Sequence, residues 1–185
     1  DVRVWNQAEQ RVKWRSYGLA APVSAVRYEG LIAVAEHGKS RVVSLNKDGE
    51  VDSILAEDLP APTGLTVRDG QLFVSDRSLG KILRIAQNGQ RLSEPEIVAE
   101  NLVSPEGFDF FGRKLVVIEA DLGDVTMIDS SGDKSLLAKI PPGTQAASEL
   151  QPPSQVFNGV AVDDNGNVYV PGETNRALYK ISNPF

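Results

Sequence analysis

A short segment that ends in Leu-x-x-Pro occurs three times in this 185-residue chain. The three copies are RSYGLAAP at 15–22, LAEDLPAP at 55–62 and VAENLVSP at 98–105. Each copy is followed by a short apolar run, a turn containing glycine, a second apolar run and a third, which ends in RVVSL, KILRI or DVTMI. We call this repeated segment the seam, because it separates one unit from the next. A repeat of this kind indicates that similar structural units follow one another along the chain, so the seam is the first constraint on the fold.

The seams set the length of one unit. The residues that lead each unit are Pro22, Pro62, Pro105 and, in a fourth copy, Phe157, and their spacings are 40, 43 and 52 residues. Units of about 40 residues with four short alternating strands and no helical stretch are typical of β-propeller blades. A Greek-key sandwich also has short strands, but it does not predict the repeated seam. We therefore expect an all-β fold, a β-propeller with about four four-stranded blades visible.

One domain is expected over residues 1–185. The blade seams are predicted near 18–22, 58–62, 101–105 and 153–157. A glycine follows the third strand of three units by four residues, at Gly49, Gly89 and Gly132, and indicates a hairpin turn. The Pro-rich stretch 141–156 is predicted to be an insertion loop, either a lid over the channel or a slack connection.

The two ends of the chain give an unusual strand count. VRVWNQ and RVKWRSYG are expected to be a third and a fourth strand, and FNGVAVD, NVYVPG and ALYKIS a first, second and third. The total of 17 strands leaves two alternatives: a small closed ring with a spare edge strand, or part of a six-bladed ring, which we favour because open strand edges promote aggregation. A second chain or copy completing the ring is a further option. The start at Asp1 indicates a processed or truncated N-terminus.

Composition excludes several classes of function. The net charge of −6 and the scattered basic residues argue against nucleic acid as a partner. No apolar run approaches the length of a membrane helix, so no membrane partner is expected. The absence of cysteine excludes thiolate nucleophiles and Cys-ligated metals. Composition leaves the compartment open, and we favour an extracytoplasmic location, periplasmic or secreted.

Two stretches carry a family resemblance. PTGLTVRDGQLFVSDRSLGKILRI at 62–85 resembles the NHL repeat, and FNGVAVDDNGNVYVPGETNRALYKI at 157–181 is similar to blades of the SMP-30/gluconolactonase group. The likeness extends over nearly the whole chain in four copies. It implies a propeller fold but does not specify a function, because proteins with this fold serve as binding scaffolds, sensors, lactonases and lyases.

The resemblance also implies a metal site. In the SMP-30 group a divalent cation in the central cavity is held by a Glu, an Asn and an Asp, and Glu106 in SPEGFDF and Asn158 in FNGVAV match the first two contexts. A Ca or Zn ion is the cofactor implied, and it would polarise a lactone carbonyl. The third ligand of that group, an Asp, has no counterpart here, because the matching position of the other copies holds Val23 or Thr63. The slot one place after the leading residue is predicted to line the channel, and it holds Val23, Thr63, Glu106 and Asn158.

Other polar residues have simpler interpretations. His37, the only histidine, is expected in a solvated turn, and its solitude excludes chemistry that needs two histidines. Acidic residues recur at the end of the second strand of each unit, and turn chemistry explains them better than a ring of carboxylates for cations. They are Glu36, Asp76 and Glu119, with Glu173 one step off. DDNGN at 163–167 lacks the twelfth-position Glu of a calcium loop and indicates a hairpin turn.

Two functions from different classes remain. The leading hypothesis is a binding scaffold that presents a small molecule or a protein at one face of the channel, through 141–156, Glu106 and Asn158. The alternative is a divalent-metal-dependent hydrolase of the lactonase or esterase type, with Glu106 and Asn158 as ligands. The sequence leaves the catalytic residues of such an enzyme unassigned and indicates no organic cofactor.

Overall fold

Nearly all regular secondary structure in the described part of the chain is β-strand. The computed structural model describes residues 1–140, 159–172 and 177–185, and it contains 17 strands and one short 3-10 helix, η1 at His37–Lys39. The strands pair into three four-stranded sheets, one three-stranded sheet and one two-stranded hairpin, all antiparallel. The all-β class and the expected strand count are confirmed. The predicted insertion loop at 141–156 lies outside the described residues.

Each sheet is one blade, in which the strands follow one another in chain order. The N-terminal hairpin is β1 (Val2–Asn6) and β2 (Arg11–Ser16). The first sheet is β3 (Pro22–Tyr28), β4 (Leu31–Glu36), β5 (Arg41–Leu45) and β6 (Val51–Ala56). The second is β7 (Pro62–Arg68), β8 (Gln71–Asp76), β9 (Lys81–Gln87) and β10 (Gln90–Ala99).

The last two sheets repeat the pattern. The third sheet is β11 (Pro105–Phe111), β12 (Lys114–Glu119), β13 (Asp124–Ile128) and β14 (Lys134–Lys139). The fourth is β15 (Ala161–Val162), β16 (Val168–Gly172) and β17 (Ala177–Ile181). The first strand of each four-stranded sheet therefore begins at a proline that ends a seam.

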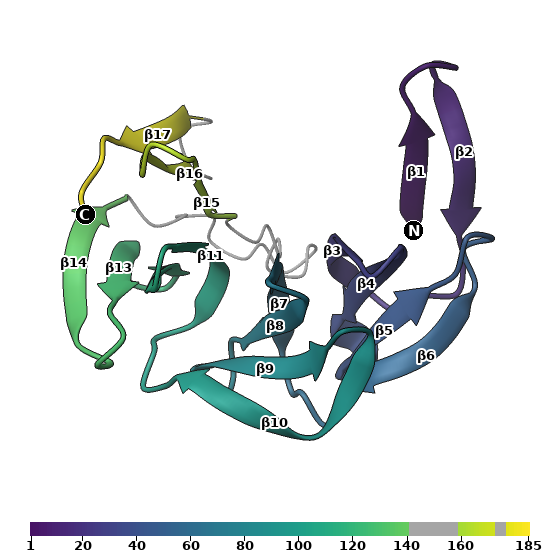
Figure 1. Cartoon of the computed structure of the whole chain (residues 1–185), viewed down its shortest axis with the longest axis horizontal. Helices are drawn as coiled ribbons and strands as arrows, with labels where there is room; N and C mark the ends of the chain where they lie inside the picture. The colour runs from purple at the N-terminus through teal and green to yellow at the C-terminus, as the bar shows by residue number, and fades with distance from the viewer. Residues whose placement is uncertain (141–158, 173–176) are drawn as a thin grey trace, which may run out of the picture.

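The sheets are arranged in an arc with their first strands at the centre (Figure 1). Strand β7 contacts β3 on one side and β11 on the other, and β11 also contacts β15. The fourth strands β6, β10 and β14 lie on the outside of the arc, while the N-terminal hairpin and the fourth sheet form its two ends (Figure 1). This is the architecture of β-propeller blades around an axis, and it brings four inner segments together.

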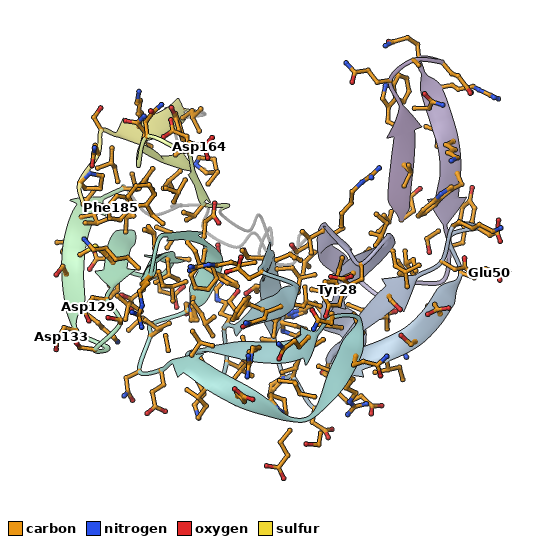
Figure 2. The ribbon with its side chains drawn as sticks, viewed as in Figure 1. Tyr28, Glu50, Asp129, Asp133, Asp164 and Phe185 are labelled. Carbon is orange, nitrogen blue, oxygen red and sulfur yellow. The ribbon has the colours of Figure 1, made fainter. Side chains whose placement is uncertain are left out.

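Apolar residues fill the space between neighbouring sheets. One cluster, which includes Leu72 and Val74, joins the first and second sheets, and another, which includes Ile82 and Val117, joins the second and third. A third cluster packs the third sheet against the fourth. Tyr28 is buried at the first boundary (Figure 2). Its hydroxyl accepts a hydrogen bond from Gly89 N at 2.9 Å. Burial is the main reason that the pKa of Tyr28 is raised, and the nearby Glu29 carboxylate raises it further.

The leucine of the seam has a structural role. Leu59 and Leu102 are buried, and their N–H groups donate to the carbonyls of Ser40 and Gly80, each at 3.0 Å. Both acceptors lie in the turn that joins the second and third strands of the preceding sheet. The seam therefore fastens the connection between two blades to the blade it leaves, which explains why Leu-x-x-Pro recurs with the period of the fold.

The glycines after the third strands close two kinds of turn. Gly49 and Gly132 close five-residue turns in which Oδ1 of Asn46 or Asp129 accepts backbone N–H groups within the turn. Gly89 forms a two-residue loop with Asn88, and both have positive φ, of 78° and 47°. Positive φ at both positions is what the tight hairpin requires. The turn prediction is confirmed at all three glycines.

Candidate functional site

Three inner strands are irregular where they begin. The pairing register shifts after Pro22 in β3, after Pro62 in β7 and after Pro105 in β11. A β-bulge of this kind bends a strand and changes the direction of its side chains. The residues just after each proline therefore do not follow the simple alternation of the rest of the strand.

The inner strands surround a cavity of about 340 Å³, which we call the axial cavity. It is lined from three inner strands and from the segment that enters the fourth. The lining residues are Val23, Ser24, Val26, Thr63, Gly64, Leu65, Thr66, Val67, Gly107, Phe108, Asp109, Gly159 and Val160. Most of these walls are apolar, and among the lining residues that the structure describes Asp109 has the one ionisable side chain.

Asp109 lines the axial cavity but was not among the residues that the sequence indicated. Its Oδ2 accepts the N–H of Val162 in β15 at 2.9 Å, and its Oδ1 accepts the N–H of Phe110 at 2.8 Å. The carboxylate therefore joins the third and fourth sheets while it faces the cavity. The same register position holds Val26 in β3 and Thr66 in β7, so a search four places after each leading proline would have found it.

A buried network of hydroxyl groups joins β7 to β11. Thr63 is 1% exposed, and its Oγ1 donates to the carbonyl of Pro105 at 3.1 Å and lies 2.8 Å from Ser75 Oγ. Ser75 Oγ also accepts the N–H of Gly64 and donates to the carbonyl of Glu106. Thr63 thus lines the axial cavity but commits its hydroxyl to holding two blades together.

Glu106 is buried, with 2% of its surface exposed, and is paired with a cation. Its Oε1 lies 2.9 Å from Nη1 of Arg77, which directly follows β8 in the neighbouring sheet. The other terminal nitrogen of Arg77 pairs with Asp121, which also accepts a hydrogen bond from Ser104. The guanidinium thus connects a buried carboxylate to an exposed one.

The four residues of the predicted slot have different surroundings. Val23 and Thr63 are among the residues that line the axial cavity, and Glu106 is held by Arg77. Asn158 lies outside the described residues, so the metal site at Glu106 and Asn158 stays a prediction. Across residues 1–140, 159–172 and 177–185, no three His, Asp or Glu side chains are grouped closely enough to hold a metal ion.

The acidic residues at the ends of the second strands hold the seams. Oε1 of Glu36, Oδ2 of Asp76 and Oε2 of Glu119 accept a seam N–H group, at 2.6, 3.0 and 2.7 Å. The donors are the backbone nitrogens of Ala20, Ala61 and Val103. All three carboxylates are buried, and each holds the seam that leads into its own sheet. These side chains accept backbone N–H groups, as the interpretation expected, but the donors lie 15 or 16 residues earlier in the seam and not in the adjacent turn. Asp76 also accepts a turn N–H, from Leu79 to its Oδ1 at 2.9 Å. Glu173 lies outside the described residues.

Electrostatics support that role at Glu36. Burial alone favours its neutral form, but the hydrogen bonds from Ala20 N, Arg41 and Lys39 outweigh burial and lower the pKa of Glu36. Arg41 Nε lies 2.6 Å and Lys39 Nζ 3.2 Å from the carboxylate. The charged form therefore holds the first seam at neutral pH.

The remaining sequence candidates are structural. His37 opens η1, and its N–H donates to the carbonyl of Ala21 in the seam. The turn is therefore confirmed, but the residue is half-buried and not fully solvated. Asp163 accepts hydrogen bonds from the side chain of Asn167 and from its backbone, and from Tyr169 and Asn165, which lower its pKa. The hairpin-turn interpretation of DDNGN is therefore confirmed. In the described part of the chain, no helix is long and apolar enough to cross a membrane.

Comparisons with known proteins agree with this architecture. A family profile described as a beta-propeller repeat matches residues 156–180. No curated protein matches the chain. Among solved structures, the chain resembles a luciferin-regenerating enzyme, with a TM-score of 0.70 at 13% identity over 97% of this chain and 64% of that one. It also resembles a putative gluconolactonase, with a TM-score of 0.68 at 15% identity over 95% of this chain and 65% of that one.

A third likeness is to a catalytically inactive virginiamycin B lyase from Staphylococcus aureus, solved with quinupristin. The TM-score is 0.59 at 16% identity, and the match covers 98% of this chain and 55% of the lyase. The chain thus spans little more than half of that enzyme's length. Identities this low show the shared fold, and the chain is a β-propeller of the kind found in these proteins.

Proposed function

We propose that this β-propeller is a binding scaffold whose axial cavity holds a small ligand. The observation that carries the proposal is the convergence of three inner strands and the segment entering a fourth on one cavity of about 340 Å³. Small-molecule sites have volumes of roughly 300 to 1,000 Å³ and apolar walls with few polar groups. The axial cavity has this character, so a ligand of small size suits it.

The chemistry of the walls suggests the class of ligand. Val26, Leu65 and Phe108 offer apolar surface, and the Asp109 carboxyl group faces the same space. Each carboxylate oxygen of Asp109 has one backbone donor and can accept a further hydrogen bond. A small amine with an apolar body matches this combination.

A matched pair of probes tests the proposal. We expect benzylamine to bind and to raise the melting temperature of the protein, because a ligand of the folded state stabilises it, whereas benzyl alcohol binds more weakly. Asp109→Asn should weaken benzylamine binding about tenfold, since hydrogen bonds to charged groups contribute about 1.5–3 kcal/mol. Asp129→Asn, which changes a turn carboxylate outside the cavity, is the control. Equal binding of both probes, unaffected by Asp109→Asn, would contradict the proposal.

The second candidate is a metal-dependent hydrolase. Two observations favour it: Glu106 places a buried carboxylate at the start of β11, and the fold resembles that of a putative gluconolactonase. Arg77 opposes it, because a guanidinium 2.9 Å from Glu106 repels a divalent cation at the same carboxylate. The binding scaffold is therefore the leading proposal.

Calcium separates the two candidates. The scaffold proposal expects no increase in melting temperature with millimolar Ca²⁺ and no hydrolysis of glucono-1,5-lactone. A metal site at Glu106 instead predicts a Ca²⁺-dependent increase that Glu106→Gln abolishes and that Arg77→Met enlarges, because the competing positive charge is removed. Ca²⁺-dependent hydrolysis of the lactone, followed by acid release, would establish the second candidate.

A further inference from the structure

A second hollow lies between the second and third sheets, away from the seams. It has a volume of about 440 Å³, and we call it the arginine crevice. Its lining residues are Arg68, Asp69, Gln71, Phe73, Phe110, Arg113 and Ser130. These residues belong to the β7–β8, β11–β12 and β13–β14 connections and the strand ends beside them. Antiparallel strands place those turns at the opposite end of the blades from the Glu106–Arg77 pair.

The apolar part of the crevice is aromatic. Phe73 is buried, and its ring centroid lies 4.9 Å from that of Phe110. Phe110 is only half-buried and also meets Phe108 edge-on at 6.3 Å. The guanidinium of Arg68 lies over the Phe110 ring, 5.1 Å from its centroid. Stacking on the ring holds this cation at the edge of a flat apolar surface.

The crevice carries more positive than negative charge, in a chain with a net charge of −6. Arg68 Nε lies 3.2 Å from Asp69, whose side chain is 79% exposed, and such an exposed pair contributes little. Arg113 is exposed, and no ion pair joins it to a carboxylate of the described residues. Two guanidinium groups therefore face one carboxylate, and the Gln71 and Ser130 side chains add hydrogen-bonding groups.

We infer that the arginine crevice is a binding site for a small aromatic oxyanion. Guanidinium groups bind carboxylate and phosphate oxygens through paired N–H donors, and a ring on the ligand would pack on the exposed part of Phe110. The positive charge excludes amines, so this site selects the opposite charge from the axial cavity. The two sites share no lining residue, although Phe110 of the crevice directly follows Asp109 of the axial cavity, so either site can exist without the other.

The test uses 4-fluorobenzoate and fluorine NMR on the full chain. We expect a Kd of about 1 mM or tighter, as suits a ligand of this size. Arg68→Gln and Arg113→Gln should each weaken binding at least fivefold. Asp69→Asn should tighten it about threefold, because it removes a repelling charge and frees Arg68, and Asn tolerates the positive φ of 49° at this position. Arg27→Gln, an exposed arginine of the first sheet, should leave the Kd unchanged.

Further measurements identify which parts of the site and of the ligand contribute to binding. Phe110→Leu keeps an apolar side chain but removes the ring, and we expect at least threefold weaker binding, with urea unfolding used to confirm that the variant is folded. Phenyl phosphate should compete with 4-fluorobenzoate, whereas acetate and inorganic phosphate should compete at least fivefold less well. Binding of 4-fluorobenzylamine with equal affinity, the same Kd in Arg68→Gln and Arg27→Gln, or no binding at 10 mM probe would each overturn the inference.

Discussion

Ser75 of β8 donates a hydrogen bond from Oγ to the backbone carbonyl of Glu106 in β11, at 2.5 Å, and so joins two neighbouring blades. The same oxygen accepts the N–H of Gly64 at 2.8 Å and lies 2.8 Å from Thr63 Oγ1. Ser75 has no exposed surface. One buried hydroxyl of β8 therefore satisfies polar groups from two other strands, β7 and β11, beside the axial cavity.

Replacing this hydroxyl should destabilise the protein. Ser75→Ala leaves the N–H of Gly64 and the carbonyl of Glu106 without this partner in a buried place, and an unsatisfied buried polar group costs about 1–3 kcal/mol. We expect the free energy of unfolding to fall by about 2–3 kcal/mol, as measured by urea denaturation. Ser93→Ala, on the exposed strand β10, should change it by less than about 0.5 kcal/mol. Equal effects of the two substitutions would show that the network contributes nothing.

Gly64 allows the close approach of β7 to β11. A Cβ atom at this position would lie 2.5 Å from the carbonyl oxygen of Glu106 and 3.0 Å from Ser75 Oγ. Gly64→Ala should therefore push two inner strands apart and lower the free energy of unfolding by about 3 kcal/mol. Gly159 has the same place in the fourth repeat, but a Cβ there would meet no atom of the described residues within 4 Å. Gly159→Ala is the matched control and should be neutral or slightly stabilising.

The sequence predicted the fold well because the seam and the turns depend on local chemistry. Leu59 and Leu102 contact the blade that they leave, and the turn at Asn88 and Gly89 needs only two adjacent residues. Features of this kind repeat with the chain, so the period of one feature predicts the others. The count of strands followed from the same period.

The site was predicted less well because its contacts join different repeats. The partner of Glu106 is Arg77, 29 residues earlier in another sheet, and no pattern within one repeat indicates that pair. Asp109 was missed because the bulges after the leading prolines change which side chains turn to the cavity. Placing such residues requires the distance between blades, which the period alone does not give.

The Arg77–Glu106 pair should stabilise the protein at neutral pH. Arg77→Met removes the cation beside a carboxylate that is 2% exposed, and losing one partner of a buried pair costs about 3–5 kcal/mol. The side chain of Arg77 is 36% exposed, so water screens the pair and we expect a loss of about 2 kcal/mol. The double variant Arg77→Met with Glu106→Gln should recover most of that loss. A double variant no more stable than Arg77→Met would show that the charge of Glu106 is not the cause.

Glu36 should make the stability of the first seam depend on pH. Its folded-state pKa is below the ordinary value of 4.5, because hydrogen bonds from Ala20 N, Arg41 and Lys39 outweigh burial. A lowered pKa means that the stabilisation is fully present above the unfolded-state pKa and is lost as the pH falls through the folded-state pKa. Wild type should therefore be more stable than Glu36→Gln at pH 7, by about 1–2 kcal/mol, since Gln keeps an acceptor for Ala20 but loses the ion pairs.

The difference between wild type and Glu36→Gln should shrink once the pH falls below 4.5, where the unfolded chain binds a proton at Glu36 that the folded chain does not. Urea denaturation at pH 7, 5, 4 and 3 measures it. Glu94→Gln, at an exposed position of β10, should show a difference near zero throughout. A Glu36→Gln difference that stays constant from pH 7 to 3 would mean that shape, and not charge, holds Ala20. The Asp76 and Glu119 seams would then need the same explanation, because their carboxylates accept equivalent seam N–H groups.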